Sequence, residues 1–164
     1  MPASQAPMLS LPEALLRAFD TNDRINQYLL ESLSDAAWTA HPPGGKGRTI
    51  AAIAAHMHNV RVMWLKAAKR ADVPEQLARD ATRAAAAEAF ARSRDALAAV
   101  LADALAGEGR VKGFRPDAAG FFGYLVAHDA HHRGQIAMQA RQVGHPISQK
   151  AMFGMWEWGS RGRD

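Results

Sequence analysis

Three of the seven histidines in the chain fall within five residues, at His128, His131 and His132. The stretch around them, residues 124–139, has the spacing of a helix that faces a protein core. At about 100° per residue, His128 and His132 lie on one face of this helix with Gln135 and Gln139 close beside them, whereas His131 is offset. Imidazole and amide groups along an inward helix face indicate a polar site rather than ordinary core packing.

A further histidine, His56, falls within the apolar face expected for the segment from about Thr49 to Arg70. That face is expected to consist of Ile53, Val60, Met63, Trp64 and Ala67. His58 lies about 200° away on the helical wheel, so we expect it at the surface. Taken alone, His56 is best interpreted as a core histidine that is hydrogen-bonded to a neighbour.

The spacing of His128 and His132 lets both imidazoles bind one metal ion, because one helical turn separates them. An inward histidine from a second helix strengthens this interpretation, since each unpaired buried imidazole would cost about 1–3 kcal/mol. A divalent cation bound by His56, His128 and His132 would satisfy all three and leave a coordination position open. Nitrogen ligands do not distinguish the metals; we expect zinc or nickel, with iron, cobalt or manganese as alternatives.

Four long amphipathic segments and a short final helix must position these histidines. They are expected at about Leu11–Leu33, Thr49–Arg70, Thr82–Ala106, Asp117–Val143 and Gln149–Trp158. No strand alternation or internal repeat interrupts them. The pattern predicts a single all-α domain over residues 1–164, a four-helix bundle with a C-terminal extra helix.

Helix start and stop signals support these bounds. Ser10 to Glu13 has the pattern of a capping box, and Thr49, Thr82 and Asp117 are expected N-caps. Gly144 is expected to end the fourth helix. The first nine residues are expected to form a loose tail.

Composition limits the classes of function. The chain has no cysteine, which excludes disulfides, thiolate ligands and a cysteine nucleophile. No apolar run approaches the roughly 20 residues of a membrane span, and no signal peptide is evident, so we expect a cytoplasmic protein without membrane association. The net charge of +4 comes from scattered Lys and Arg residues, which argues against nucleic-acid binding.

The histidine segments resemble the DinB-like (damage-inducible) family of four-helix-bundle metalloproteins. The resemblance is carried by residues 49–65, by residues 123–135 with their His-His-Arg-Gly-Gln element, and by residues 153–159. It implies an up-down-down-up bundle, often a homodimer, with a divalent metal held by three histidines. Carried over by position, these are His56, His128 and His132.

The resemblance implies several reactions, and two mechanisms fit the residues. A metal-dependent transferase could use an external low-molecular-weight thiol to attack a small electrophile; the thiol must be a cosubstrate because the chain has no cysteine. A metal-dependent hydrolase could instead use metal-bound hydroxide. A non-catalytic metal-binding stress protein is the third interpretation, and an interaction module using the aromatic C-terminal helix is a fourth.

Candidate catalytic residues lie beside the expected ligands. His131 is a candidate proton shuttle, although a supporting or merely exposed residue is an alternative interpretation. Gln135 could hold water on the metal, or it could pack against the first helix. Asp129 occupies the position of the glutamate in the His-Glu-x-x-His pattern of zinc hydrolases, but its shorter side chain favours a supporting or surface role.

Overall fold

The computed structural model describes residues 9–162, and the regular structure in this part of the chain is entirely helical. Four long helices form the body of the molecule: α1 (Leu11–Glu31), α3 (Ile50–Ala67), α4 (Arg83–Ala106) and α5 (Ala118–Gln142). Short helices occupy the connections and the C-terminal segment: α2 (Asp35–Thr39), the 3-10 turn η1 (Pro43–Gly45), α6 (Gln149–Gly154) and α7 (Trp158–Arg161). The predicted all-α fold is confirmed.

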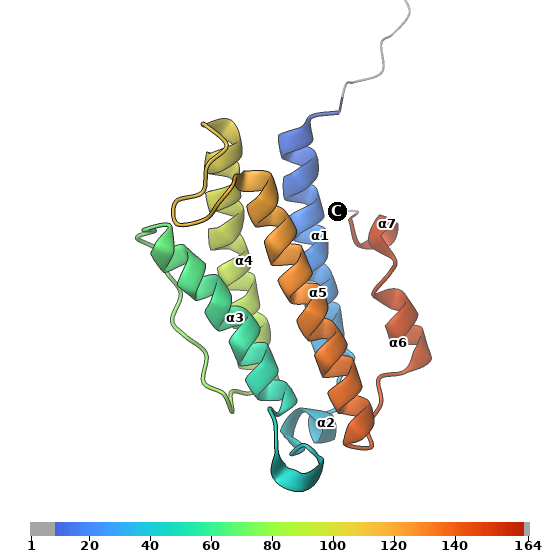
Figure 1. Cartoon of the computed structure of the whole chain (residues 1–164). Coiled ribbons are helices and arrows are strands. Elements are labelled where there is room, and N and C mark those ends of the chain that lie inside the picture. The colour runs from blue at the N-terminus through green and yellow to red at the C-terminus, as the bar shows by residue number, and fades with distance from the viewer. Residues whose placement is uncertain (1–8, 163–164) are drawn as a thin grey trace, which may run out of the picture.

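The long helices α1 and α5 run in one direction, and α3 and α4 run in the other (Figure 1). Because α3 and α4 are parallel, residues 68–82 must return along the length of the bundle before α4 begins (Figure 1). This order is the up-down-down-up bundle that the family resemblance implied. The short helices α6 and α7 lie along one side of the bundle, as expected for a C-terminal extension.

Side-chain caps explain where three of the long helices begin. The Thr49 and Thr82 hydroxyls and the Asp117 carboxylate each accept a backbone N–H from the first turn of α3, α4 and α5, respectively. Gly144 follows α5 with a φ of 83°, a conformation that favours glycine. Ser10 occupies the N-cap position of α1, but its side chain makes no capping hydrogen bond, so the expected capping box is wrong.

This difference between the caps gives a testable prediction. We expect Thr49→Ala to lower the free energy of unfolding by about 1 kcal/mol, because the Ala52 N–H loses its acceptor. Ser10→Ala is the matched control and should change stability by less than about 0.5 kcal/mol. Urea denaturation of both variants measures the difference, and equal losses would contradict this assignment of the caps.

The α1–α3 connection and the C-terminal segment both differ from the prediction. The α1–α3 connection includes α2, which begins at Ser34, whose side chain accepts the Ala37 N–H. The final helix, expected to be continuous to Trp158, instead ends at Gly154, and α7 begins after a break. Helix α1 ends at Glu31, two residues before its expected end. Residues 1–8 of the expected tail lie outside the described residues.

A layer of polar side chains divides the core of the bundle. One apolar cluster includes Leu29, Ile50, Phe90 and Ile136, and the other lies farther along the same helices. The second cluster includes Phe19, Leu65, Leu97 and Phe121. Between the two clusters, each long helix contributes buried polar residues: Asn22, Asp23, Asn26, His58, Arg61, Ser93, Asp129 and His132.

None of the helices described is long and apolar enough to cross a membrane.

Candidate metal centre

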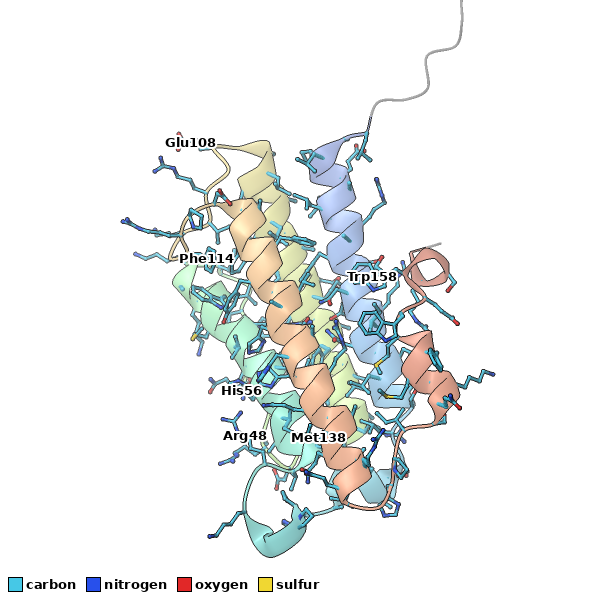
Figure 2. The ribbon with its side chains drawn as sticks, turned by 45° about the vertical axis from the view of Figure 1, so that its right-hand side comes forward. Arg48, His56, Glu108, Phe114, Met138 and Trp158 are labelled. Atoms are coloured by element: carbon cyan, nitrogen blue, oxygen red, sulfur yellow. The ribbon has the colours of Figure 1, made fainter. Side chains whose placement is uncertain are left out.

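The packing of α3 against α5 brings His56, His128 and His132 together at one edge of the polar layer. One nitrogen from each imidazole lies within 4.8 Å of the other two. The ring centroids are 5.5 Å apart for His56–His128, 4.7 Å for His56–His132 and 4.4 Å for His128–His132. Figure 2 shows His56 beside α5, with Arg48 close to it. Residues 72 positions apart in sequence therefore form one cluster.

The cluster reaches both the core and the solvent. His132 is buried, whereas His56 and His128 are partly exposed. Within the described residues, the cluster contains three side chains of a kind that binds metals, and all three are imidazoles. Three protein ligands at a partly exposed position are typical of metal sites that keep a coordination position for water or substrate. The donor set and the spacing both fit a divalent transition metal.

The amide of Gln135 determines the orientation of two imidazoles. Its oxygen lies 2.8 Å from Nδ1 of His132, so this nitrogen donates the hydrogen bond and Nε2 keeps a free lone pair. That Nε2 lies 3.2 Å from Nε2 of His128. The Gln135 nitrogen donates to Nε2 of His131 at 3.0 Å. A hydrogen bond to the outer nitrogen is the usual way in which a ligating histidine is oriented.

The environment of the cluster favours neutral imidazoles, the form that binds metal. Burial, together with the charges of His128 and His56, lowers the pKa of His132 to about 4, although its hydrogen bond to Gln135 opposes this shift. Burial and the nearby Arg48 lower the pKa of His56. Burial also lowers the pKa of His58, which lies in the polar layer outside the cluster.

These shifts predict how stability depends on pH. The pKa of His132 in the folded protein lies below the ordinary value of 6.5, so at a pH below about 6.5 this imidazole becomes protonated in the unfolded chain but stays neutral in the folded protein. Proton binding then favours the unfolded chain. The free energy of unfolding of the metal-free protein should therefore be lower at pH 5 than at pH 7.5. In His132→Gln, which lacks one of these groups, the decrease should be smaller. Denaturant unfolding at both pH values tests this, and an equal decrease in wild type and variant would contradict it.

Asp129 is buried at the centre of the polar layer and links the histidine cluster to α1. Its Oδ2 accepts hydrogen bonds from Nδ2 of Asn22 at 2.7 Å, Nδ2 of Asn26 at 2.9 Å and Nη2 of Arg61 at 2.8 Å. Its Oδ1 faces Nδ1 of His128 at 4.0 Å. Burial opposes ionisation, but Arg61 and the hydrogen bonds hold the pKa of Asp129 below its usual value. Asp129 is therefore an ionised supporting residue and not a surface residue.

Arg61 provides the compensating charge. Its side chain is 1% exposed, and its Nη1 lies 2.7 Å from Oδ1 of Asp23. Burial opposes the charged form, yet the two carboxylates keep the pKa of Arg61 above its usual value. Burial, together with the nearby Asp129, raises the pKa of Asp23 although Arg61 opposes this shift, so Arg61 compensates the charge of Asp129 more completely than that of Asp23.

The orientation expected for the second long helix was partly wrong. His58, expected in solvent, is completely buried, with Nδ1 3.1 Å from the Ser93 hydroxyl and Nε2 2.9 Å from the Glu75 carbonyl oxygen. Met63 and Ala67, expected to be buried, are exposed. The reason is that α3 directs a polar stripe, including Arg61, into the core, where partners from other helices satisfy it.

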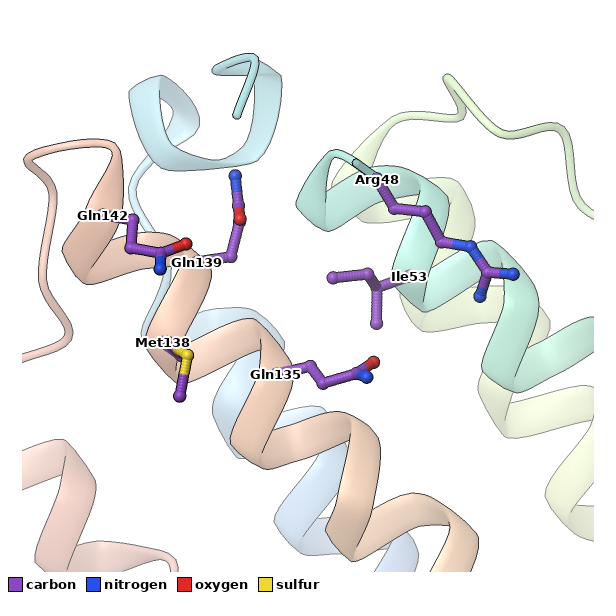
Figure 3. Close-up of a pocket in the computed structure, with 6 residues that line it drawn as sticks. All are labelled: Arg48, Ile53, Gln135, Met138, Gln139 and Gln142. Atoms are coloured by element: carbon purple, nitrogen blue, oxygen red, sulfur yellow. The ribbon is translucent and has the colours of Figure 1, made fainter. Parts of the chain in front are cut away.

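A pocket of about 440 Å³ lies next to the cluster, and the sequence did not predict it. Arg48, Ile53, Gln135, Met138, Gln139 and Gln142 line it (Figure 3). Gln135 connects the pocket to His132 through its hydrogen bond. Nε2 of Gln139 is buried and has no hydrogen-bond partner among the described residues. Gln135, Gln139 and Gln142 are spaced to lie on one face of α5, and this spacing was the sequence signal that could have revealed one side of the pocket.

The two candidate catalytic residues occupy different positions relative to the cluster. Gln135 is exposed but contacts His132 directly, and it faces the pocket beside α3 rather than packing against α1 as one alternative had it. His131 is exposed, and its ring centroid lies 4.9 Å from that of His132. The structure therefore places both residues at the margin of the cluster.

A four-helix bundle with three converging imidazoles defines a class of protein whose site fits a divalent metal. Within this class, the chain belongs to the DinB superfamily, whose family model matches residues 18–136. This range includes α3 and α4 in full, most of α1 and α5, and the three histidines. No significant match was found among curated proteins, and none was found among solved structures.

Proposed function

We propose that His56, His128 and His132 bind one divalent metal ion and that the protein is a metal-dependent transferase. In this proposal, an external low-molecular-weight thiol loses its proton to solvent, and its sulfur forms a bond to a carbon of a small electrophile while a leaving group departs from that carbon with the electron pair of the broken bond. The observation that carries the proposal is the convergence of three imidazoles at a partly exposed position beside a pocket. A sealed cluster without a neighbouring pocket would instead have favoured a purely structural metal site.

The residues of the chain would contribute orientation and charge. A bound divalent metal would supply the positive charge that keeps a coordinating thiol deprotonated. Gln135 holds Nδ1 of His132, which keeps the opposite nitrogen directed to His128 and available as a ligand. Because His131 accepts a hydrogen bond from Gln135 through Nε2, its proton resides on Nδ1. His131 is exposed, so its ring contacts solvent at the margin of the cluster.

The pocket beside the cluster favours a polar cosubstrate. Arg48 supplies a positive charge, and three glutamines supply amide donors and acceptors. We infer that the polar part of the thiol or of the electrophile lies here, since an apolar molecule would leave these groups unsatisfied.

The hydrolase alternative receives less support from the geometry. In the His-Glu-x-x-His pattern, the acidic residue acts as a general base. The equivalent Asp129 is buried, its Oδ2 accepts three hydrogen bonds, and its pKa is below the usual value. A carboxylate held in this way cannot readily accept a proton from water at the histidine cluster.

Thiol-dependent turnover of metal-loaded protein tests the proposal. Glutathione, cysteine and coenzyme A would be assayed with an alkylating electrophile such as monobromobimane, with zinc-loaded, nickel-loaded and chelator-treated protein compared. We expect at least one thiol to react faster with metal-loaded wild type than with either the chelator-treated protein or His56→Ala.

Two outcomes would contradict the transferase. If metal-loaded and chelator-treated protein gave the same rates with every thiol, the protein would not be a transferase for the thiols tested. If turnover of an ester needed the metal but no thiol, the hydrolase would be supported instead. Metal binding without either activity would favour the non-catalytic stress protein.

A further inference from the structure

A second pocket lies between α5 and the C-terminal segment that contains α6 and α7, with a volume of about 350 Å³. Figure 2 shows Trp158, one of its lining residues, on the opposite flank of α5 from His56. The pocket is therefore separate from the histidine cluster and from the pocket beside it. The proposed metal-dependent reaction makes no use of it.

The walls of this second pocket are apolar. Helix α5 contributes small side chains, among them Ala130, Gly134 and Ala137, which leave room next to the helix. The C-terminal segment contributes Met152 and Trp156, whose large side chains face this space. Sites for small molecules are typically apolar with a small number of polar groups that orient the ligand.

The outer wall is anchored to α1, so the pocket exists before any ligand arrives. Gly154 of α6 packs directly on the Tyr28 ring, and even a Cβ at this position would collide with that ring. The Arg161 guanidinium lies 3.5 Å from the Tyr28 ring centroid, and its Nε donates to the Gly154 carbonyl oxygen at 2.8 Å. These contacts hold α6 and α7 against α1 and preserve the space next to α5.

Arg133 is the one charged residue that lines this pocket, and no acidic residue lines it. Its Nη1 donates to Oδ1 of Asn22 at 2.9 Å and to Oδ1 of Asn26 at 2.7 Å. Among the described residues, its Nη2 and Nε make no hydrogen bond, and no carboxylate forms an ion pair with it. Burial lowers the pKa of Arg133, although the nearby Asp129 opposes this shift.

We propose that this pocket binds a small apolar carboxylate, with the carboxylate on Arg133 and the apolar body between α5 and the Met152–Trp156 wall. A guanidinium with free donors suits a planar carboxylate, which can accept two parallel hydrogen bonds. The apolar walls select against small hydrophilic anions, because these would leave the methionine and tryptophan side chains uncovered.

Isothermal titration calorimetry of the full-length protein with 2-naphthoate tests this proposal. 2-Naphthamide, which has nearly the same shape but no charge, is the matched ligand. We expect 2-naphthoate to bind, and 2-naphthamide to bind at least about tenfold more weakly, as the loss of a charge-assisted hydrogen bond implies.

Two pairs of variants locate the binding. Arg133→Gln should weaken 2-naphthoate binding about tenfold, whereas Arg92→Gln removes the same charge from an exposed part of α4 and should not. Gly134→Leu should abolish binding by filling the pocket. The backbone tolerates a side chain at this position, since a Cβ at Gly134 would meet nothing within 4 Å. Gly123→Leu, equally unobstructed on α5 but outside the pocket, should leave binding unchanged.

The Gly134→Leu variant tests the pocket even if Arg133→Gln destabilises the fold. Leucine is a better helix former than glycine, so this substitution should not unfold α5. Absence of 2-naphthoate binding to the wild type would overturn the proposal. So would equal affinities for the carboxylate and the amide, or equal losses in Gly134→Leu and Gly123→Leu. None of these results depends on whether the histidine cluster binds metal.

Discussion

His132→Ala is expected to reduce the bound divalent metal from about one ion per chain to less than about a tenth of that amount, because one of three ligands is lost. His56→Ala and His128→Ala should have the same effect, since the three imidazoles form a single cluster. The measurement is elemental analysis by mass spectrometry after each purified variant has been loaded with one equivalent of zinc or nickel and then desalted.

Two histidines outside the cluster serve as controls. His145→Ala alters an exposed residue after α5 and should keep the full metal content. His58→Ala removes a buried imidazole that binds Ser93 and the Glu75 carbonyl, so it should lower stability but not metal content. If all five variants retained the same amount of metal, the three-histidine assignment would be wrong.

Arg61→Met is expected to lower the free energy of unfolding by about 3–5 kcal/mol, the second large effect. The substitution leaves Asp23 and Asp129 buried without their shared guanidinium, and an uncompensated buried charge is strongly destabilising. Denaturant unfolding monitored by circular dichroism measures the change.

Arg92→Met is the matched control for this loss. Arg92 pairs with Glu88 at 3.7 Å, but both side chains are more than half exposed, so the change in stability should stay within about 0.5 kcal/mol. Similar losses in the two variants would mean that the polar layer contributes no more than a surface ion pair.

The fold could be predicted well because its signals are local. Helical periodicity, the Thr49, Thr82 and Asp117 caps, and Gly144 each concern residues close in sequence, and each was confirmed. The capping box at Ser10 was wrong because a favourable residue type does not ensure the hydrogen bond. Helix α2 was missed, although Ser34 before Asp35 was a recognisable start signal.

The polar layer could be predicted only in part because its partners are distant in sequence. Asn22 and Asn26 of α1 both bind Asp129, which lies more than 100 residues away in sequence. His58 was expected at the surface because its partners, Ser93 and the Glu75 carbonyl, are not its neighbours in sequence. A helical wheel gives the direction of a side chain on its own helix, but it does not show which residues of other helices will form hydrogen bonds with that side chain.

X-ray absorption spectroscopy of the metal-loaded wild-type protein, before and after addition of a thiol, tests the central claim most directly. With zinc, we expect three imidazole nitrogens at about 2.0–2.1 Å and one oxygen ligand from water. A sulfur should replace this oxygen when thiol is added. A first shell with fewer than three imidazoles, or one that excludes sulfur at saturating thiol, would contradict the account.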